Sequence, residues 1–339
     1  MSLTRRRFTQ ILASTLFLHH LPSFAQSVKF WASLTLPEAQ HITRIVSAGA
    51  PADLLLLAVA PEKMVGFSSF DFARQALIPL PEHIRQFPCW DDSPGAPAHS
   101  LEGLMALHPD LVVDCGNTDE TWISQARQVS EQTQIPWLLL NGKLEQSAEQ
   151  LTTLGKTLGE EHRAAEQANL ASRFVGEAQA FATSPAANLS FYAARGPRGL
   201  ETGLQGSLHT EAAELLGLHN VAQIADRHGL TQVSMENLLR WQPDIILVQE
   251  AVTADFIRRD PLWQGVKAVA EQRILFLSGL PFGWLDAPPG INRLLGLRRL
   301  HAWLDPAINR QFKSDMQHYA QLFWHCSLSD ADYQKLVAS

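Results

Sequence analysis

The 339-residue sequence has little cysteine, and it lacks the motifs that usually mark a catalytic or metal centre. Its three cysteines, Cys89, Cys115 and Cys326, include no C-x-x-C pair, which argues against a zinc ribbon or a redox motif. There is no G-x-S-x-G, no Walker A loop, no H-E-x-x-H and no G-x-G-x-x-G after a predicted strand. We therefore predict no catalytic residues, no protein-held metal and no resident cofactor. The pairing state of the three cysteines is left open by the sequence.

The chain also lacks an excess of positive charge. It has 27 Lys and Arg against 34 Asp and Glu, a net charge of −7. The first 25 residues hold three arginines and no acid, so the remaining chain carries −10. An acidic surface disfavours nucleic acid and anionic membrane as main partners.

The amino-terminal apolar stretch, residues 11–21, is far shorter than the ~20 residues of a spanning helix. Arginines precede it and P-S-F-A follows it, as in a signal peptide cleaved near Ala25. The sequence T-R-R-R-F at residues 4–8 fits a twin-arginine signal, and it also fits an ordinary secretion signal with a basic start. Either route predicts an exported, periplasmic protein.

Short apolar runs at residues 44–49, 111–114, 137–140 and 245–248 predict buried strands. Helical stretches separate these runs. Strands that alternate with helices predict an α/β fold with parallel sheets covered on both faces.

The chain contains one internal repeat, with an offset of 134 residues and no gap. Residues 100–113 read S-L-E-G-L-M-A-L-H-P-D-L-V-V, and residues 234–247 read S-M-E-N-L-L-R-W-Q-P-D-I-I-L. In each copy a Ser can cap a helix, a Glu suits its first turn, and Pro-Asp leads from the helix into a strand. Two such copies predict two α/β lobes of similar build.

A proline-free, alanine-rich stretch lies between the two copies. Ala164, Ala168, Ala171, Val175 and Ala178 form one apolar stripe at helical spacing. We predict a signal peptide (1–25), an N-terminal lobe (26–159), a linking helix (160–182) and a C-terminal lobe (183–339). The predicted fold is two Rossmann-like lobes with parallel sheets, joined by one long rigid helix.

This organisation resembles the helical-backbone class of periplasmic binding proteins, which serve ABC importers of ferric siderophores, haem and cobalamin. The resemblance covers about residues 40–325. It rests on the repeat and on I-V-S-A-G-A-P (45–51), L-G-K-T-L-G (154–159), G-L-E-T-G (199–203), L-H-T-E-A-A-E-L-L-G (208–217), L-P-F-G-W (280–284) and P-P-G-I-N-R-L-L-G-L (288–297). It implies a monomer that binds a small ligand, most often a metal chelate, in the cleft between its lobes.

In this family a surface glutamate on each lobe meets arginines of the permease dimer. The matching positions here are Glu102 and Glu236. An Arg–carboxylate pair fixes register as well as adding energy. The alternative role of both residues is to stabilise a helix start.

Loops that follow the strands should line the ligand cleft. Aromatic side chains there suit a flat or apolar chelate, and arginines suit an anionic one. The ligand-binding candidates are Trp122, Tyr192, Arg195, Arg198, Phe282 and Trp284. Core packing is the competing interpretation for the aromatics, and a solvated turn or a pair with Glu201 is the competing interpretation for the arginines.

Histidines at positions 83, 99, 209, 219 and 228 show no metal-ligand spacing. A ferric siderophore is the favoured cargo, while haem, cobalamin and an oxyanion such as molybdate are alternatives. Two other classes stay open: an exported enzyme with an unrecognised site in the cleft, and an adaptor or sensor without a small ligand.

Overall fold

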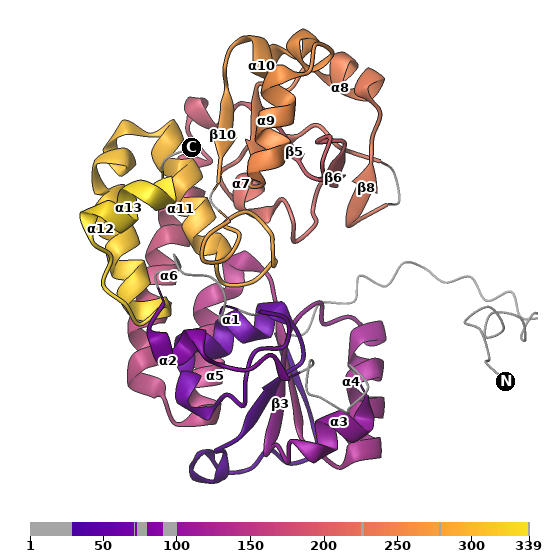
Figure 1. Cartoon of the computed structure of the whole chain (residues 1–339), viewed down its shortest axis with the longest axis vertical. Coiled ribbons are helices and arrows are strands. Elements are labelled where there is room, and N and C mark those ends of the chain that lie inside the picture. Colours follow the sequence, from indigo (N-terminus) through magenta and orange to yellow (C-terminus); the bar gives the residue numbers. More distant parts are fainter. Residues whose placement is uncertain are drawn as a thin grey trace, which may run out of the picture.

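The computed structural model describes residues 29–70, 72, 80–90, 100–224, 227–277 and 279–337. The predicted signal peptide, residues 1–25, lies outside them. Two α/β lobes lie at the two ends of the long axis of the molecule, and long helices run along one side between them (Figure 1). Among the described helices, none combines the length and the apolar character needed to cross a bilayer.

The N-terminal lobe (N-lobe) is built on a four-stranded sheet in the order β1-β4-β3-β2. Its strands are β1 (Phe30–Ser33), β2 (Ile45–Ser47), β3 (Leu111–Gly116) and β4 (Trp137–Asn141). The last three are parallel and coincide with predicted runs, and their apolar residues are buried on both faces. Strand β1 is antiparallel to β4, an edge strand that the sequence analysis did not predict.

The C-terminal lobe (C-lobe) has a parallel sheet in the order β10-β9-β5-β7. Its strands are β5 (Ser190–Ala194), β7 (His219–Asn220), β9 (Ile245–Val248) and β10 (Ile274–Phe276). A small antiparallel pair, β6 (Glu201–Gly203) and β8 (Leu230–Gln232), lies beside it. The predicted two-lobed α/β fold is therefore confirmed.

Helices cover both sheets and fill the side of the molecule. In the N-lobe they are α1 (Ala50–Val59), α2 (Glu82–Arg85), α3 (Leu101–Ala106), α4 (Glu120–Thr133) and α5 (Ser147–Leu158). In the C-lobe they are α7 (Glu211–Leu215), α8 (Met235–Trp241), α9 (Ala251–Arg259) and α10 (Lys267–Ala270). Four more, α6 (Glu161–Phe181), α11 (Arg293–Leu304), α12 (Pro306–Phe323) and α13 (Asp330–Val337), lie along the side.

The long helix α6 packs against both α5 and α11. All five residues of its predicted stripe are buried. A Cβ at Gly155 of α5 would overlap the Ala164 methyl, so small residues allow the two helices to approach closely. Buried Arg298 of α11 reaches Glu177 of α6 and donates from Nε to Asp315 Oδ2 of α12 at 2.7 Å. Helix α6 is thus held by apolar and ionic contacts. The domain boundaries drawn on either side of it stay a prediction.

The two repeat copies fold alike. Asp110 Oδ2 accepts hydrogen bonds from the backbone N–H groups of Thr43 (2.8 Å) and Arg44 (2.9 Å) at the start of β2. Asp244 Oδ2 accepts one from the N–H of Ser190 (2.8 Å) at the start of β5. In both lobes the repeated Asp therefore ties its own strand to the parallel neighbour, which explains why Asp follows Pro in both copies.

Candidate functional site

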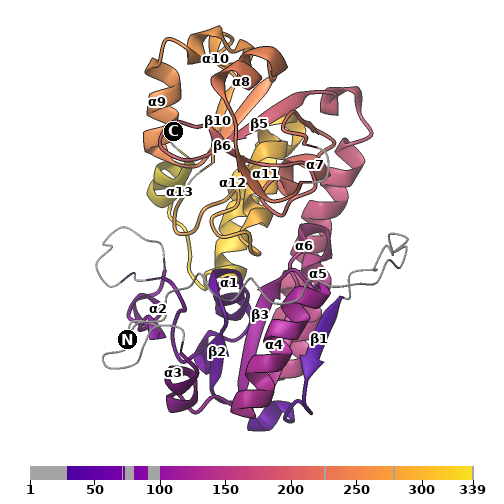
Figure 2. The same ribbon diagram turned by 90° about the vertical axis from the view of Figure 1, so that its right-hand side faces the viewer.

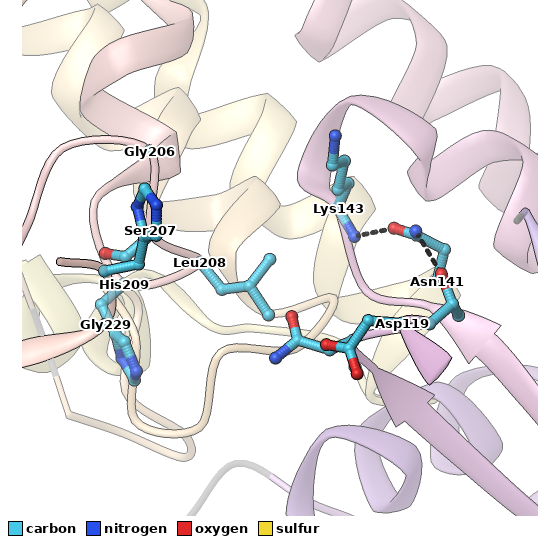
Figure 3. Close-up of a pocket in the computed structure, with 12 residues that line it drawn as sticks. Asp119, Asn141, Lys143, Gly206, Ser207, Leu208, His209 and Gly229 are labelled. Carbon is cyan, nitrogen blue, oxygen red and sulfur yellow. Dashed lines mark hydrogen bonds between the residues drawn. The ribbon is translucent and has the colours of Figure 1, made fainter. Parts of the chain in front are cut away.

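A cavity of about 300 Å³ lies between the lobes, at the carboxyl ends of the N-lobe strands. Its N-lobe wall follows β3 and β4, and its C-lobe wall follows β6 and precedes β8 (Figure 3). This is where parallel α/β sheets place their ligands. Twelve residues line it: Gly116, Asn117, Thr118, Asp119, Asn141, Lys143, Gly206, Ser207, Leu208, His209, His228 and Gly229.

The N-lobe wall is held by hydrogen bonds between the two strand exits. Asn141 donates from Nδ2 to Thr118 Oγ1 at 2.8 Å, and its Oδ1 accepts from the backbone N–H of Lys143 at 3.0 Å. Gly142 N donates to Gly116 O at 2.6 Å, and a Cβ at position 142 would lie 2.9 Å from Gly116 Cα. Glycine at 142 therefore lets the segment after β4 approach the segment after β3, and their hydrogen bond fixes the backbone of both.

Asp119, in the N-lobe wall, is the N-cap of α4. Its Oδ1 accepts from Thr121 N (2.9 Å) and Trp122 N (3.2 Å) at the start of α4. Those bonds engage Oδ1 and stabilise the start of α4.

The C-lobe wall contains an oriented imidazole. His209 lies with Nδ1 2.9 Å from Oδ2 of Asp286, whose side chain is fully buried. Arg195 and Gln249 also donate to the Asp286 carboxylate. In a neutral imidazole, a carboxylate at Nδ1 favours the proton on that nitrogen and leaves Nε2 as the accepting atom. The sequence therefore builds a histidine of fixed ring orientation into the cavity lining.

A buried ion pair joins the two walls. Arg293 of α11 donates from Nη1 to Leu208 O (2.6 Å) and to Glu211 Oε2 (2.7 Å), and from Nη2 to Gly142 O. The same Glu211 oxygen accepts from Leu144 N at 2.9 Å. Burial raises the pKa of the Glu211 carboxyl, although the Arg293 guanidinium pulls it down. This pair, called here the wall clamp, contacts backbone next to the lining on both lobes and so sets the width of the cavity.

None of the six predicted ligand-binding residues lines this cavity. Tyr192 is buried in β5 and donates from its hydroxyl to Gly199 O at 2.9 Å. Phe282 is buried against Phe70, with ring centroids 5.0 Å apart, and buried Trp284 donates from Nε1 to Leu280 O at 2.9 Å. These three aromatic side chains belong to the packed core.

The other three candidates are more accessible. Trp122 is 43% exposed in the first turn of α4. Arg198 is exposed and lies with Arg195 at a separate hollow of about 320 Å³ beside Gln232. Arg195 bonds to Glu201 and Asp286, so it is linked to the cavity through His209. Ligand contact by any of these six residues stays a prediction.

The predicted docking residues lie apart from the cavity. Glu102 and Glu236 are exposed in the first turns of α3 and α8. The two helices lie at opposite ends of the long axis, on the side facing away from α6 and α12 (Figure 1). Their role in docking stays a prediction.

The comparisons with known proteins bear on this two-lobed site. The family model described as "Periplasmic binding protein" matches residues 90–279, which is more than half of the chain. The chain belongs to the periplasmic binding protein family. A search of curated proteins found no match.

Solved structures of periplasmic binding proteins share the fold. An ABC transporter solute-binding protein from Sulfurospirillum deleyianum is 25% identical, with a TM-score of 0.77 over 89% of this chain and 95% of that one. The molybdate-binding MolA of Haemophilus influenzae is 21% identical, with a TM-score of 0.66 over 87% and 96%. The vitamin B12-binding BtuF of Vibrio cholerae is 19% identical, with a TM-score of 0.57 over 80% and 99%. The family resemblance inferred from the sequence is therefore confirmed, and the neighbours span several ligands.

Proposed function

We propose that this periplasmic binding protein captures a compact, polar metal chelate in the interlobe cavity and delivers it to the permease dimer of an ABC importer. The observation that carries the proposal is the imidazole of His209, oriented by buried Asp286, in a lining that also holds Lys143 and His228. Neutral imidazole nitrogens are good ligands for transition metals, and a carboxylate behind the ring is the usual way to orient them. A small ferric siderophore is the favoured cargo.

The size of the cavity supports a small ligand over a tetrapyrrole. A volume of about 300 Å³ lies at the lower end of the ~300–1,000 Å³ range of ligand pockets. Leu208 is the largest aliphatic side chain among the residues that line it, and Figure 3 shows it projecting from the C-lobe wall. Haem presents a broad apolar face, and the twelve residues that line the cavity include no Phe, Tyr or Trp to stack on it.

An oxyanion of the molybdate type is the second candidate. The lining offers the ammonium of Lys143 and the hydroxyls of Thr118 and Ser207, which suit a small tetrahedral anion. An oxyanion would use Lys143 and not need the accepting nitrogen of His209, whereas a metal chelate would use that nitrogen. The two candidates therefore predict different mutant phenotypes.

The proposal is tested by titrating the mature protein with ferric siderophores, haem, cobalamin and molybdate, following tryptophan fluorescence. We expect saturation at one equivalent by a ferric siderophore and about ten-fold weaker binding by His209→Ala. His318→Ala, at an exposed position on α12, is the matched control. Binding of molybdate with loss in Lys143→Ala alone would select the second candidate. Ligand-dependent product formation would instead support the exported-enzyme class.

Delivery requires docking, which we assign to Glu102 and Glu236. Each carboxylate is exposed at a helix start, one on each lobe, and can meet arginine on one half of a two-fold permease. The protein would act as a monomer, because one molecule supplies both carboxylates. An adaptor that binds no small ligand would need the docking residues but would have no need of the cavity.

A further inference from the structure

The two repeat copies present the same kind of outward surface, including an apolar residue that each lobe leaves partly exposed. Leu104 and Leu238 are buried beneath their helices, while Met105 and Leu239 are 43% and 38% exposed. These two exposed residues stand at the same repeat position, 134 residues apart, as do Glu102 and Glu236.

The backbone of the two copies matches as closely as the burial. Ser100 and Ser234 begin the helices with nearly the same dihedrals, φ −92° and ψ 151° against φ −92° and ψ 157°. Past the helices, His108 and Gln242 both adopt a left-handed φ of 47°. The two helices therefore begin alike and are followed by the same left-handed turn residue, although α8 is one residue longer than α3.

A single exposed apolar side chain is ordinary on a protein surface. An exposed apolar residue at the same position of both copies needs an explanation, because an amphipathic helix would place polar residues at positions 105 and 239. Each exposed apolar residue also lies three positions after a Glu, and residues three apart are neighbours on a helix surface. Each lobe thus offers a carboxylate beside an apolar side chain.

The C-lobe copy also shows how this exposure is preserved. Leu239 lies over Gly265, where a Cβ would come within 2.9 Å of its Cδ2 atom. The Leu239 side chain therefore rests on this turn and keeps part of its surface open to solvent.

We infer that Met105 and Leu239 are docking residues, each of which enters an apolar socket beside an arginine on one half of the permease dimer. The inference rests on the proposed function and adds a second component to each docking point. Figure 1 and Figure 2 place α3 and α8 on one side of the molecule, at the two ends of its long axis. A partner with two-fold symmetry has two equivalent binding sites, and this chain has two similar helices, α3 and α8, that could bind one site each.

The physical reason for pairing the two residue types is that an exposed ion pair alone adds little affinity in water. An apolar side chain buried next to it excludes water, which strengthens the ion pair and adds its own transfer energy. The carboxylates would therefore set register and encounter rate, and the apolar side chains would set the lifetime of the complex.

The test uses the ligand-loaded protein and the permease of its own importer in nanodiscs, with Kd measured at several salt concentrations. Met105→Ser and Leu239→Ser should each weaken binding about ten-fold, mainly through faster dissociation, and the double variant about a hundred-fold. Ligand Kd should stay unchanged, and binding should keep the sensitivity to salt that the carboxylates give it. Val252→Ser, at a 73% exposed position on α9 outside the repeat, is the matched control.

The outcomes separate this inference from the proposed function. Glu102→Gln and Glu236→Gln should weaken binding and flatten its salt dependence. If these variants lose affinity and the double serine variant does not, the apolar contribution is refuted and carboxylate docking stands. An equal loss in Val252→Ser would also refute it. If neither pair of variants changes the affinity, the docking surface itself is wrong.

Discussion

The two copies of the repeat, residues 100–113 and 234–247, match through their helices and diverge where their strands end. After β3 the chain forms Gly116–Asp119, which lines the cavity directly. After β9 it supplies Gln249, which donates to Asp286 behind the lining residue His209. The helices of the repeated part face outward, and the unrepeated segments that follow its strands build the cavity. A two-fold partner favours equal surfaces, whereas a small ligand enclosed between lobes needs two different walls.

The wall clamp belongs to the unrepeated part, and breaking it should have the largest effect. Arg293→Met leaves Glu211 and the carbonyls of Gly142 and Leu208 without their buried donor, at a cost of about 3 kcal/mol in unfolding free energy. Ligand affinity should fall too, because the width of the cavity is no longer fixed. Urea unfolding and ligand titration measure both effects.

The matched control for this change is Arg240→Met, at an exposed position of α8. It should leave both stability and ligand affinity within error of the wild type. An Arg293→Met variant with unchanged ligand affinity would show that the cavity width is set elsewhere.

The glutamates proposed for docking belong to the repeated part, so we expect their loss to be symmetrical. Glu102→Ala and Glu236→Ala should each reduce uptake about ten-fold, while ligand affinity stays unchanged. Uptake of radiolabelled ligand in cells measures the effect, with Glu166→Ala on an exposed face of α6 as the control. Full uptake by the double variant would contradict the docking role, and a loss in only one variant would break the symmetry argument.

The same division explains what the sequence could predict. Strands β2, β3, β4 and β9 follow from short apolar runs and the stripe of α6 from helical spacing, both of which act within one element, so these were predicted. Strands β5, β7 and β10 were not among the predicted runs. The edge strand β1 depends on pairing Phe30 with Leu140, a contact between distant parts of the chain. The cavity likewise needs Asn141, His209 and His228 to meet across two lobes, and no local pattern encodes that meeting.

One residue of the cavity lining could have been predicted from the sequence. Lys143 follows a predicted strand by three residues, so the rule that ligands gather at the carboxyl ends of strands points to it. The aromatics Tyr192, Phe282 and Trp284 satisfied the same rule and are buried, because a large ring next to a strand end often completes the core. Exposure is a tertiary property, and residue type alone does not decide it.

The repeated aspartates allow a pH test of how alike the two lobes are. Burial alone would raise the pKa of Asp244, but hydrogen bonds from Lys267 and Ser190 outweigh it and lower the pKa to about 2. Burial opposes the shift at Asp110 in the same way, and bonds from Thr43 and Arg44 lower the pKa there. A lowered carboxyl pKa stabilises the fold above the ordinary value near 4, and that stability is lost as pH falls from about 4 toward 2.

Asp244→Asn should therefore cost about 1 kcal/mol at pH 7, after allowing for solvent screening, and less at pH 3. Asp110→Asn should cost somewhat less, because only Asp244 has a lysine partner, with its Oδ1 2.6 Å from Lys267 Nζ. Urea midpoints at pH 3, 5 and 7 measure both. A loss that does not depend on pH would show that the carboxylates act through shape and not through charge.

The smallest expected effect is a difference in unfolding free energy between loss of the α3 cap, Ser100, and loss of the α8 cap, Ser234. Ser100 Oγ accepts from Gly103 N at 2.9 Å, and Ser234 Oγ accepts from Asn237 N at 3.1 Å. Only Asn237 has a side chain that reaches back, with Oδ1 accepting from Ser234 N at 3.2 Å. Ser100→Ala should cost about 1 kcal/mol, and Ser234→Ala about half of that, because the second bond of the capping box survives. Adding Asn237→Gly to Ser234→Ala should remove this difference. If Ser234→Ala proves the costlier of the two single changes, the returning bond from Asn237 does not hold the helix start, and the two lobes begin their docking helices in the same way after all.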